Sequence, residues 1–521
     1  MNCRHKIVPL AALALGATLG VSAREVQKKP NFILIMTDQQ RADLCAREGF
    51  PLDLTPFADR AAQEGAWFNR AYCAAPASGP SRVSFLTGRY PKVTHADSNH
   101  NINDAVYGAD MFGYARKNGY LTALVGKNHS FMNKESADFW CPYDHLGQPV
   151  SDERKGRANA DFDKFLGGTD FYAWFEPSPG TVEQQLPYRM VDDAVEWIGE
   201  NRDRPFLMWL SFPEPHNPYQ VCEPYFSMFE GKVPPALTDA SARETKGEKF
   251  VQLAEMMGQG HKDFEKNLER LRTTYMGMIR MLDDQMARLV DELKKMGVYE
   301  NTVFVIMSDH GDYAGEYGLM KKGAGLVDPI ARVPMVWFGP GIEAVGLRDD
   351  HVSMVDVFPT VCEMMGGEIP LGVQGRSLKN MLGGEPYPQE EFRSVMAETG
   401  YGGEYYTKAD DDDYIKEGAV QKKPYFFDEL NTWSQSGSMR MVRMGDWKLV
   451  YDMHGNGELY NVEQDPAEIR NLFDKKRYAR QREELLKELL KWEIATVDPI
   501  PVPRNRYYFK RNPHNYLFYK E

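Results

Sequence analysis

The sequence lacks several features that mark common protein classes. After its first 23 residues it has no apolar run near the roughly 20 residues that a membrane-spanning helix requires, and it has no internal repeats. The net charge of −13 leaves no general excess of positive charge. This balance argues against a general affinity for nucleic acid or anionic lipid, although a single pocket could still be basic.

Cysteine is also scarce, with six among 521 residues. The chain has no Cys-x-x-Cys pair and no cysteine–histidine cluster, so a structural zinc site is not indicated. Five cysteines lie beyond the N-terminal segment. Their odd number and wide spacing predict buried thiols with room for one disulfide among them. They are Cys45, Cys73, Cys141, Cys222 and Cys362.

The N-terminus is typical of a signal peptide. A basic start at residues 4–6 precedes an apolar stretch at 7–20, and small residues then offer a cleavage point after Ala23. We therefore expect residues 1–23 to be removed and the mature protein to be periplasmic or secreted. A short N-terminal anchor is the alternative interpretation.

The apolar content, 42% of residues, suffices for a large core. Five short apolar runs have the pattern of strands that are buried on both faces, as in a parallel sheet covered by helices. These runs are 32–36, 121–125, 206–212, 302–307 and 334–338. Between them, residues 191–200 and 271–296 have the apolar spacing of helices. Strands that alternate with helices predict an α/β fold with a mostly parallel sheet.

The pattern changes after about residue 380, where residues 383–386 are typical of a linker. Further on, three short strands and one charged amphipathic helix are predicted. Their ranges are 438–442, 447–451, 458–460 and 476–494. We therefore predict a main domain over residues 24–380 and a smaller C-terminal α+β domain with an antiparallel sheet over residues 381–521.

Polar residues cluster directly after four of the predicted strands. The clusters are Asp38-Gln39, Gly126-Lys127-Asn128-His129, Pro215-His216 and Asp309-His310. Ligand sites of open α/β sheets form beyond the carboxyl ends of the strands. The shared placement of these clusters therefore predicts one active site.

Residues 78–89 read Ser-Gly-Pro-Ser-Arg-Val-Ser-Phe-Leu-Thr-Gly-Arg. This segment resembles the signature of the sulfatase family: Cys or Ser, any residue, Pro, Ser or Ala, Arg, three residues, then Leu-Thr-Gly-Arg. The match is complete, with Ser in the first position. A helix cap by itself needs one Ser or Thr, and neither the proline nor the two arginines. We expect the helix to begin near Ser81 and to direct its N-terminus at an anion.

The resemblance implies an alkaline-phosphatase-like fold and hydrolysis of a sulfate monoester through a covalent sulfo-enzyme. It also implies that a separate maturation enzyme, of the radical type found in anaerobic bacteria, oxidises Ser78 to formylglycine (3-oxoalanine). The hydrated aldehyde has two hydroxyls on one carbon. One attacks sulfur, and the other loses its proton as sulfate is expelled, which splits one difficult step into two.

The same resemblance implies a metal site formed by Asp38, Gln39, Asp309, His310 and the modified side chain of Ser78. Oxygen ligands suit Ca²⁺, with Mg²⁺ as the alternative, whereas a histidine is less typical of calcium. The family usually has two adjacent acids where this chain has Asp38 and Gln39, so one negative charge is missing here. Taken singly, each pair could also be a turn-forming aspartate.

Three further segments resemble motifs of the family that carry basic residues. Residues 126–129 resemble its Gly-Lys-x-His motif, and residues 215–218 resemble its Pro-His-x-Pro segment. Lys322, ten residues before Arg332-Val333-Pro334, resembles its sulfate-binding lysine, and Lys321 is the rival for that role.

These motifs imply the catalytic roles. We assign Lys127 and Lys322 to the sulfate oxygens, because fixed cations stabilise the charge that builds in the transition state. Arg82 would hold the nucleophile and the metal ligands, and His129 would be the base that deprotonates the second hydroxyl. His216 or Lys322 would act as acid or hydrogen-bond donor toward the leaving alcohol.

Other polar features are less specific. Substrate contacts in the family often follow the signature helix, but a polar surface loop is an equal explanation here. The residues concerned are His95, Asp97, His100 and Asn101. The acidic run 410–413 is interpreted as a solvated loop, since it lacks the ligand spacing and glycine of a calcium loop. The aromatic residues of 401–426 could stack on sugar rings, but packing is their more common role.

By resemblance to secreted bacterial sulfatases of the serine type, we expect a sulfated sugar of the glycosaminoglycan or mucin kind as substrate, and a monomer or homodimer. Two alternatives stay open. The first is a phosphomonoesterase or phosphodiesterase of the same superfamily, in which unmodified Ser78 attacks phosphorus. The second is a non-catalytic glycan-binding relative.

Overall fold

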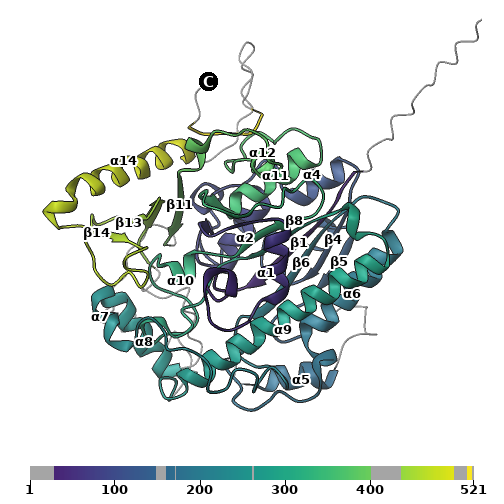
Figure 1. The fold of residues 1–521 in the computed structure, drawn as a ribbon, viewed down its shortest axis with the longest axis horizontal. Coiled ribbons are helices and arrows are strands. Elements are labelled where there is room, and N and C mark those ends of the chain that lie inside the picture. Colours follow the sequence, from purple (N-terminus) through teal and green to yellow (C-terminus); the bar gives the residue numbers. More distant parts are fainter. Residues whose placement is uncertain are drawn as a thin grey trace, which may run out of the picture.

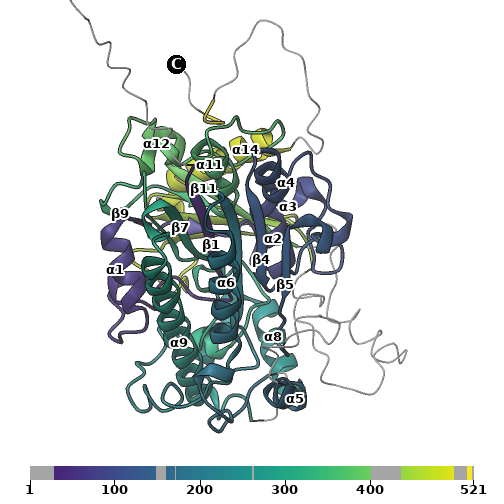
Figure 2. The ribbon, with the colours of Figure 1, turned by 90° about the vertical axis from the view of Figure 1, so that its right-hand side faces the viewer.

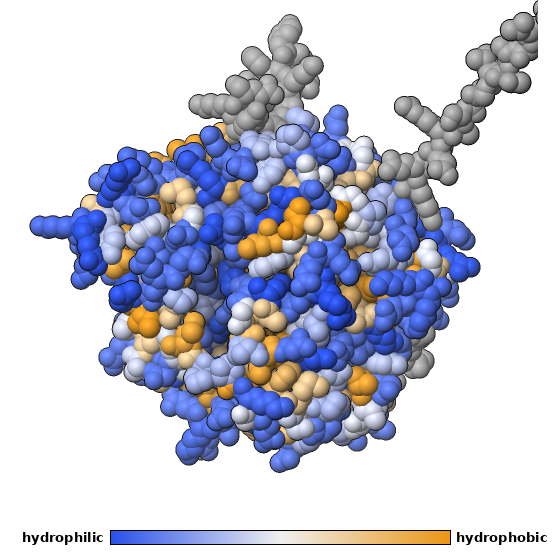
Figure 3. Space-filling model, in the orientation of Figure 1, coloured by the Kyte–Doolittle hydropathy of each residue, from blue (hydrophilic) through white to orange (hydrophobic). Residues whose placement is uncertain are grey.

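The computed structural model describes residues 29–147, 160–169, 172–260, 263–400, 436–497 and 513–518. The predicted signal peptide, the acidic run 410–413 and the aromatic residues of 401–426 lie outside these ranges. A large central sheet has helices on both faces, and a second sheet with the helix α14 lies beside it (Figures 1 and 2). Polar residues dominate the face seen in Figure 3, where apolar residues form small separate groups.

The main sheet has eight strands in the order β5-β4-β6-β1-β7-β8-β2-β9. In that order they span Phe139–Pro142, Leu121–Gly126, Phe206–Pro215, Asn31–Asp38, Thr302–Ser308, Met335–Phe338, Ala66–Phe68 and Gly346–Arg348. The first five run parallel to one another, whereas β8 runs antiparallel to both of its neighbours. The predicted mostly parallel sheet is confirmed, and the strand predicted at 334–338 forms an antiparallel part of it.

The central strand β1 explains why the predicted strands are continuously apolar. Phe32, Leu34 and Met36 pack in the core on one face of the sheet. Ile33 and Ile35 pack in the core on the other face. Since all five side chains are fully buried, neither face tolerates the polar alternation of a half-exposed strand.

Helices cover the two faces. The helices α1 (Pro56–Glu64), α6 (Leu186–Asn201) and α9 (Leu268–Lys295) pack on one face. The helices α2 (Ser78–Thr87), α4 (Met111–Lys117) and α11 (Val357–Met364) pack on the other. The two predicted helices correspond to α6 and α9; α6 begins earlier than predicted because a proline occupies its first turn, where it is tolerated. The shorter elements are β3 (Ala71–Tyr72), α3 (Pro91–Thr94), α5 (Ala160–Gly168), α7 (Arg243–Lys246), α8 (Glu248–Gly260), α10 (Asp328–Ala331), β10 (Val352–Ser353) and α12 (Lys379–Leu382).

The C-terminal sheet is antiparallel, in the order β11-β12-β13-β14. Its strands span Ser394–Thr399, Met439–Met444, Trp447–Asp452 and Gly457–Asn461, and α14 (Ala479–Thr496) packs on it. The three predicted strands and the predicted helix are confirmed. The strand β11 was not predicted, because its partner β12 follows only after a long polar stretch and no nearby hairpin turn marks the pair. The division at residue 380 stays a prediction.

A buried ion cluster joins this sheet to the main part of the chain. Lys448 of β13 donates to Asp328 Oδ1 at 2.7 Å and to Glu468 Oε1 at 3.0 Å. The Lys448 and Glu468 side chains have no exposed surface. Arg443 of β12 adds a contact of 3.4 Å to Asp328 Oδ2. Burial raises the pKa of Asp328, but the charges of Lys448, Arg443 and Arg332 outweigh this effect and hold the pKa well below its usual range. Asp328 and Glu468 thus share a cation, Lys448, from the second sheet.

The structure bears on the predictions about cysteine pairing and membrane-spanning segments. All five cysteines beyond the N-terminus are buried free thiols, so the disulfide for which the sequence left room is not formed. Within the described ranges, no helix combines the length and the apolar character needed to cross a bilayer.

Replacing Lys448 with methionine should lower the free energy of unfolding by about 3–5 kcal/mol, because it removes the cation that contacts the fully buried Glu468 carboxylate and one of the cations that contact Asp328. Urea denaturation followed by tryptophan fluorescence measures this change. Lys295→Met is the control: Lys295 is 68% exposed beside Glu292, and such pairs contribute little. Equal denaturation midpoints for the two variants would contradict the role of the cluster.

Candidate active site

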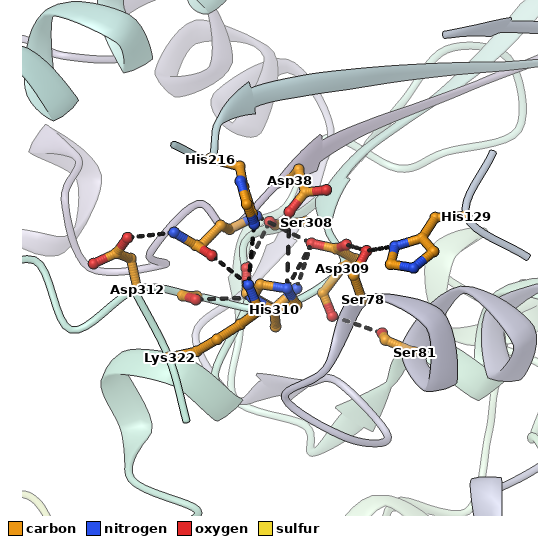
Figure 4. A network of polar contacts seen from close by, with 12 residues as sticks. Asp38, Ser78, Ser81, His129, His216, Ser308, Asp309, His310, Asp312 and Lys322 are labelled. Atoms are coloured by element: carbon orange, nitrogen blue, oxygen red, sulfur yellow. Dashed lines mark hydrogen bonds and ion pairs between the residues drawn. The ribbon is translucent and has the colours of Figure 1, made fainter. Parts of the chain in front are cut away.

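The four polar clusters predicted at strand ends lie together at one edge of the main sheet. The strands β1, β4, β6 and β7 end at Asp38, Gly126, Pro215 and Ser308. These strands are parallel neighbours in the sheet, so their carboxyl ends meet. Figure 4 shows side chains from these ends directed at one another around Asp309.

Ser78 is the first residue of α2, so the helix begins earlier than the predicted start near Ser81. The Ser78 hydroxyl donates to Asp309 Oδ2 at 2.8 Å and accepts from Arg82 Nε at 3.0 Å. His129 Nδ1 lies 3.0 Å from the hydroxyl oxygen of Ser78. The backbone N–H groups of this turn and the positive end of the helix dipole favour an anion at this position.

Arg82, one turn along α2, ties the site together. Its Nε donates to Asp309 Oδ2 at 2.9 Å, and its Nη2 donates to Asp38 Oδ2 at 3.1 Å. Its Nη1 donates to Ser211 Oγ at 2.6 Å and to the carbonyl of Lys127 at 3.0 Å. The guanidinium is fully buried and connects residues of β1 and β6 with Asp309, directly after β7. Its predicted role, to hold the nucleophile and the metal ligands, stays a prediction. Ser211 was not predicted, since a serine inside an apolar strand has no distinguishing spacing.

Asp38, Asp309 and His310 offer ligand atoms that all lie within 4.8 Å of one another. His310 Nε2 is 3.8 Å from Asp38 Oδ1 and 3.7 Å from Asp309 Oδ1. In the part of the chain that the structure describes, Asp38 Oδ1 and His310 Nε2 have no hydrogen-bond partner. A buried polar atom left unpaired costs about 1–3 kcal/mol. A cation between these atoms would satisfy both, so the residues fit a metal.

The protonation of these groups agrees with metal binding. Burial lowers the pKa of His310 to about 4, so its imidazole is neutral near pH 7. Its Nδ1 lies 2.9 Å from the carbonyl of Gly311, which assigns the proton to Nδ1 and leaves the Nε2 lone pair for a ligand. Burial raises the pKa of Asp38, but the charges of Lys127 and Arg82 outweigh this effect and hold the pKa of Asp38 well below its usual range.

Gln39 lies beside this group with its amide held at both ends. Its Oε1 accepts from Lys322 Nζ at 2.7 Å, and its Nε2 donates to Asp312 Oδ2 at 2.6 Å. Its backbone N–H donates to Asp309 Oδ1 at 3.0 Å. The amide oxygen therefore faces the site, and whether it also binds the metal stays a prediction. Asp312 and Tyr219, whose hydroxyl donates to Asp312 at 2.6 Å, were missed. The short spacing from Asp309 to Asp312 was the available signal for Asp312.

Two lysines from different segments of the chain reach the site. Lys127 Nζ forms an ion pair with Asp38 and lies 2.9 Å from His145 Nε2. Lys322 Nζ lies 3.1 Å from His216 Nε2. The rival Lys321 instead places its ammonium over the ring of Tyr172, 5.2 Å from the centroid. The geometry thus brings Lys127, His216 and Lys322 together and directs Lys321 elsewhere.

The imidazole of His129 lies next to Ser78, and its role as a base stays a prediction. Burial, followed by the charges of Lys127 and Arg82, lowers the pKa of His129 to about 3. The imidazole is therefore neutral near pH 7 and can accept a proton. Its Nδ1 contact to Ser78 Oγ is direct, without an intervening residue.

The loop after the signature helix braces the helix start. The side chain of Asn99 accepts from the backbone N–H of Gly79 at 2.8 Å. The predicted residue Asn101 donates to the carbonyl of His95 and to Asp97, both at 2.7 Å. These contacts give the loop a structural role next to Ser78, and its role in substrate contact stays a prediction.

Comparisons with known proteins agree with this geometry. A family model described as Sulfatase matches residues 30–367. An arylsulfatase of Clostridium perfringens is 28% identical over 494 residues, which cover 89% of this chain and 94% of that protein. An N-acetylglucosamine-6-O-sulfatase of Bacteroides thetaiotaomicron is 25% identical over 569 residues, which cover 97% of this chain and 93% of that protein.

A solved structure shows the same fold. A phosphonate monoester hydrolase of Silicibacter pomeroyi is similar with a TM-score of 0.75 at 20% identity, over 94% of this chain and 100% of that chain. At this identity the likeness concerns the fold alone.

Adding Ca²⁺ to chelator-treated protein should raise its melting temperature, because an ion present at 100 times its Kd adds about 2.7 kcal/mol to the free energy of unfolding. His310→Ala should abolish most of this shift, since it removes a ligand. Differential scanning calorimetry measures both, with Mg²⁺ as a second ion and the exposed-loop variant His454→Ala as the control. An undiminished shift in His310→Ala would contradict the assignment of the site.

Proposed function

The chain belongs to the sulfatase family and is a sulfuric ester hydrolase, and we propose that it removes sulfate from a carbohydrate ester by means of a formylglycine derived from Ser78 and a bound Ca²⁺. The observation that carries the proposal is the position of the Ser78 oxygen. It lies within 3.0 Å of a carboxylate (Asp309), a guanidinium (Arg82) and a neutral imidazole (His129) at a helix N-terminus. This environment suits a reacting oxygen next to an anion.

The proposal requires a divalent cation and a hydrated formylglycine, and the chain offers a position for each. A cation held by Asp38, Asp309, His310 and the oxygen of Gln39 would supply positive charge beside Ser78 and the sulfate oxygens, and Mg²⁺ is the alternative to Ca²⁺. A hydrated formylglycine at position 78 would supply a nucleophilic hydroxyl and a second hydroxyl whose proton must leave to release sulfate.

Lys127 and Lys322 would bind the sulfate. Both ammonium groups are held by fixed partners at the edge of the sheet. Both side chains are buried. Ammonium groups that are already positioned in a water-poor site stabilise developing negative charge without a reorganisation cost. Arg82 would stay paired with the carboxylates of Asp38 and Asp309, so the sulfate would be bound by the two lysines.

The reaction would need a base for the second hydroxyl and a hydrogen-bond donor for the leaving alcohol. His129, neutral and 3.0 Å from Ser78 Oγ, would accept the proton of the second hydroxyl. His216 lies on the opposite side of the site and contacts Lys322. Of the two predicted donors to the leaving alcohol, Lys322 would give this hydrogen bond. The neutral His216 directs Nδ1 at the carbonyl of Asn217, 2.7 Å away, and accepts from Lys322 at Nε2.

The carbohydrate substrate is supported by the relatives. The N-acetylglucosamine-6-O-sulfatase of Bacteroides thetaiotaomicron, whose match extends over 97% of this chain, is named for a sugar sulfate. We propose a sulfated sugar of the glycosaminoglycan or mucin type, maturation of Ser78 by a separate radical-type enzyme, and a periplasmic or secreted location. The unmodified-serine phosphatase and the non-catalytic binding protein are the outcomes that would replace this proposal.

Ser78→Ala should lose all detectable sulfatase activity, because the side chain of Ser78 supplies the reacting group. It should keep the melting temperature of the wild-type protein, because the first turn of α2 is preserved. The assay is release of sulfate from a panel of defined sulfated mono- and disaccharides. Mass spectrometry of the Ser78 peptide from the native host should show loss of two hydrogens and reaction with an aldehyde reagent. An unconverted serine together with phosphatase activity would favour the first alternative, and no turnover of either ester would favour the second.

His129→Gln should lower kcat by about 10²–10⁴-fold while KM changes little, because it removes a general base and keeps a polar side chain of similar size. Steady-state kinetics on the sugar identified by the panel measures the effect. Lys321→Gln, which alters a basic residue that points away from the site, is the matched control. A His129→Gln enzyme with unchanged kcat would remove His129 from the mechanism.

A further inference from the structure

Two lysine–imidazole pairs face each other at the site, and one of their members, His145, carries no assigned role. Lys127 Nζ lies 2.9 Å from His145 Nε2, and Lys322 Nζ lies 3.1 Å from His216 Nε2. The two imidazole rings stack with centroids 4.1 Å apart and planes inclined by 26°. His145 comes from the turn that follows β5, an element that supplies no other residue to the site.

Hydrogen-bond capacity defines what His145 does to Lys127. An ammonium has three donors and no acceptor. One donor of Lys127 is directed at Asp38 and a second at His145. Two partners fixed in different directions leave the third N–H with a defined direction, which a flexible four-carbon side chain would not have by itself.

The imidazole of His145 can accept this hydrogen bond because it is neutral. Burial, followed by the charge of Lys127, holds the pKa of His145 well below its usual range. Its Nε2 is then the acceptor toward the ammonium, as His216 Nε2 is toward Lys322. Stacking on His216, which is buried, restricts rotation of the His145 ring, so the acceptor itself has a fixed direction.

We propose that His145 is a positioning residue that aims the third N–H of Lys127 at a sulfate oxygen and holds the ring of His216 beside it. The inference rests on the proposed function, because it takes Lys127 as a sulfate ligand. Without His145, the ammonium would be drawn fully toward Asp38, and its remaining donors would lose their common direction. The loss would therefore be expressed through Lys127 and not through a contact of His145 with the reacting atoms.

The test combines His145→Ala, the conservative His145→Gln and the double variant with Lys127→Met. Two readouts are used: the Kd of inorganic sulfate by titration calorimetry, and kcat/KM on the sugar sulfate that the wild-type protein hydrolyses. His145→Ala should weaken both by about 10- to 100-fold, the effect of losing a hydrogen bond to a charged group. His145→Gln, whose amide oxygen can still accept from Lys127, should recover a substantial part.

The double variant separates positioning from direct contact. If His145 acts through Lys127, adding His145→Ala to Lys127→Met should change sulfate affinity by less than about twofold, because interacting residues are not additive. His514→Ala is the matched control, since His514 is another half-buried histidine, paired with Glu363 near the C-terminus. It should leave both readouts unchanged.

Several outcomes would overturn the inference. Additive losses in the double variant would show that His145 acts independently of Lys127. If the wild-type protein binds sulfate and hydrolyses the ester, and His145→Ala changes neither the sulfate affinity nor the turnover, the inference is refuted and the proposed function stands. If the wild-type protein neither binds sulfate nor hydrolyses any sulfate ester, the proposed function is refuted, and the inference with it.

Discussion

The site depends on the buried guanidinium of Arg82. It bridges carboxylates from two different strands, Asp38 and Asp309, and contacts the oxygen of Ser78. Two like charges this close in a low-dielectric interior would otherwise raise each other's pKa and favour protonation. The permanently charged guanidinium, together with the ammonium of Lys127, lowers the pKa of both carboxylates and keeps them ionised, and ionised carboxylates are what a divalent cation requires. Substrate binding and metal binding therefore share one internal brace.

The sheet makes this arrangement possible because its register brings distant segments to the same level. Asp38 is the last residue of the central strand β1, Asp309 follows β7, and Ser211 lies within β6. The strands β6 and β7 are the two neighbours of β1 in the sheet. The strands themselves are apolar on both faces, so polar side chains can collect only where they end. Around the acidic centre lie two ammonium groups, each with a neutral imidazole partner. The site thereby holds positive charge ready for an anion without having to ionise its histidines.

The sequence predicted the parts of this structure that follow from local pattern or from a motif. The strands of the main sheet appeared as apolar runs, and residues 78–89 identified the helix that carries Ser78. Local pattern did not reveal β11, whose partner is far along the chain, or the antiparallel direction of β8, which depends on the path of the connection. It also missed Ser211, Tyr219 and His145. Each of these reaches the site through tertiary packing, and none has a spacing that distinguishes it from an ordinary core or loop residue.

The burial of Ser78 has a consequence for the order of events in the life of the protein. Ser78 is only 2% exposed, and its oxygen already contacts Arg82 of the same helix and two residues from distant parts of the chain, His129 and Asp309. Another enzyme cannot place its own catalytic groups around an atom enclosed in this way. Any oxidation of Ser78 by such an enzyme must therefore take place on a newly made or still unfolded polypeptide, before the first turn of α2 docks on the sheet. Folding would then prevent the modification, and a chain that folded before the oxidation would keep its serine permanently.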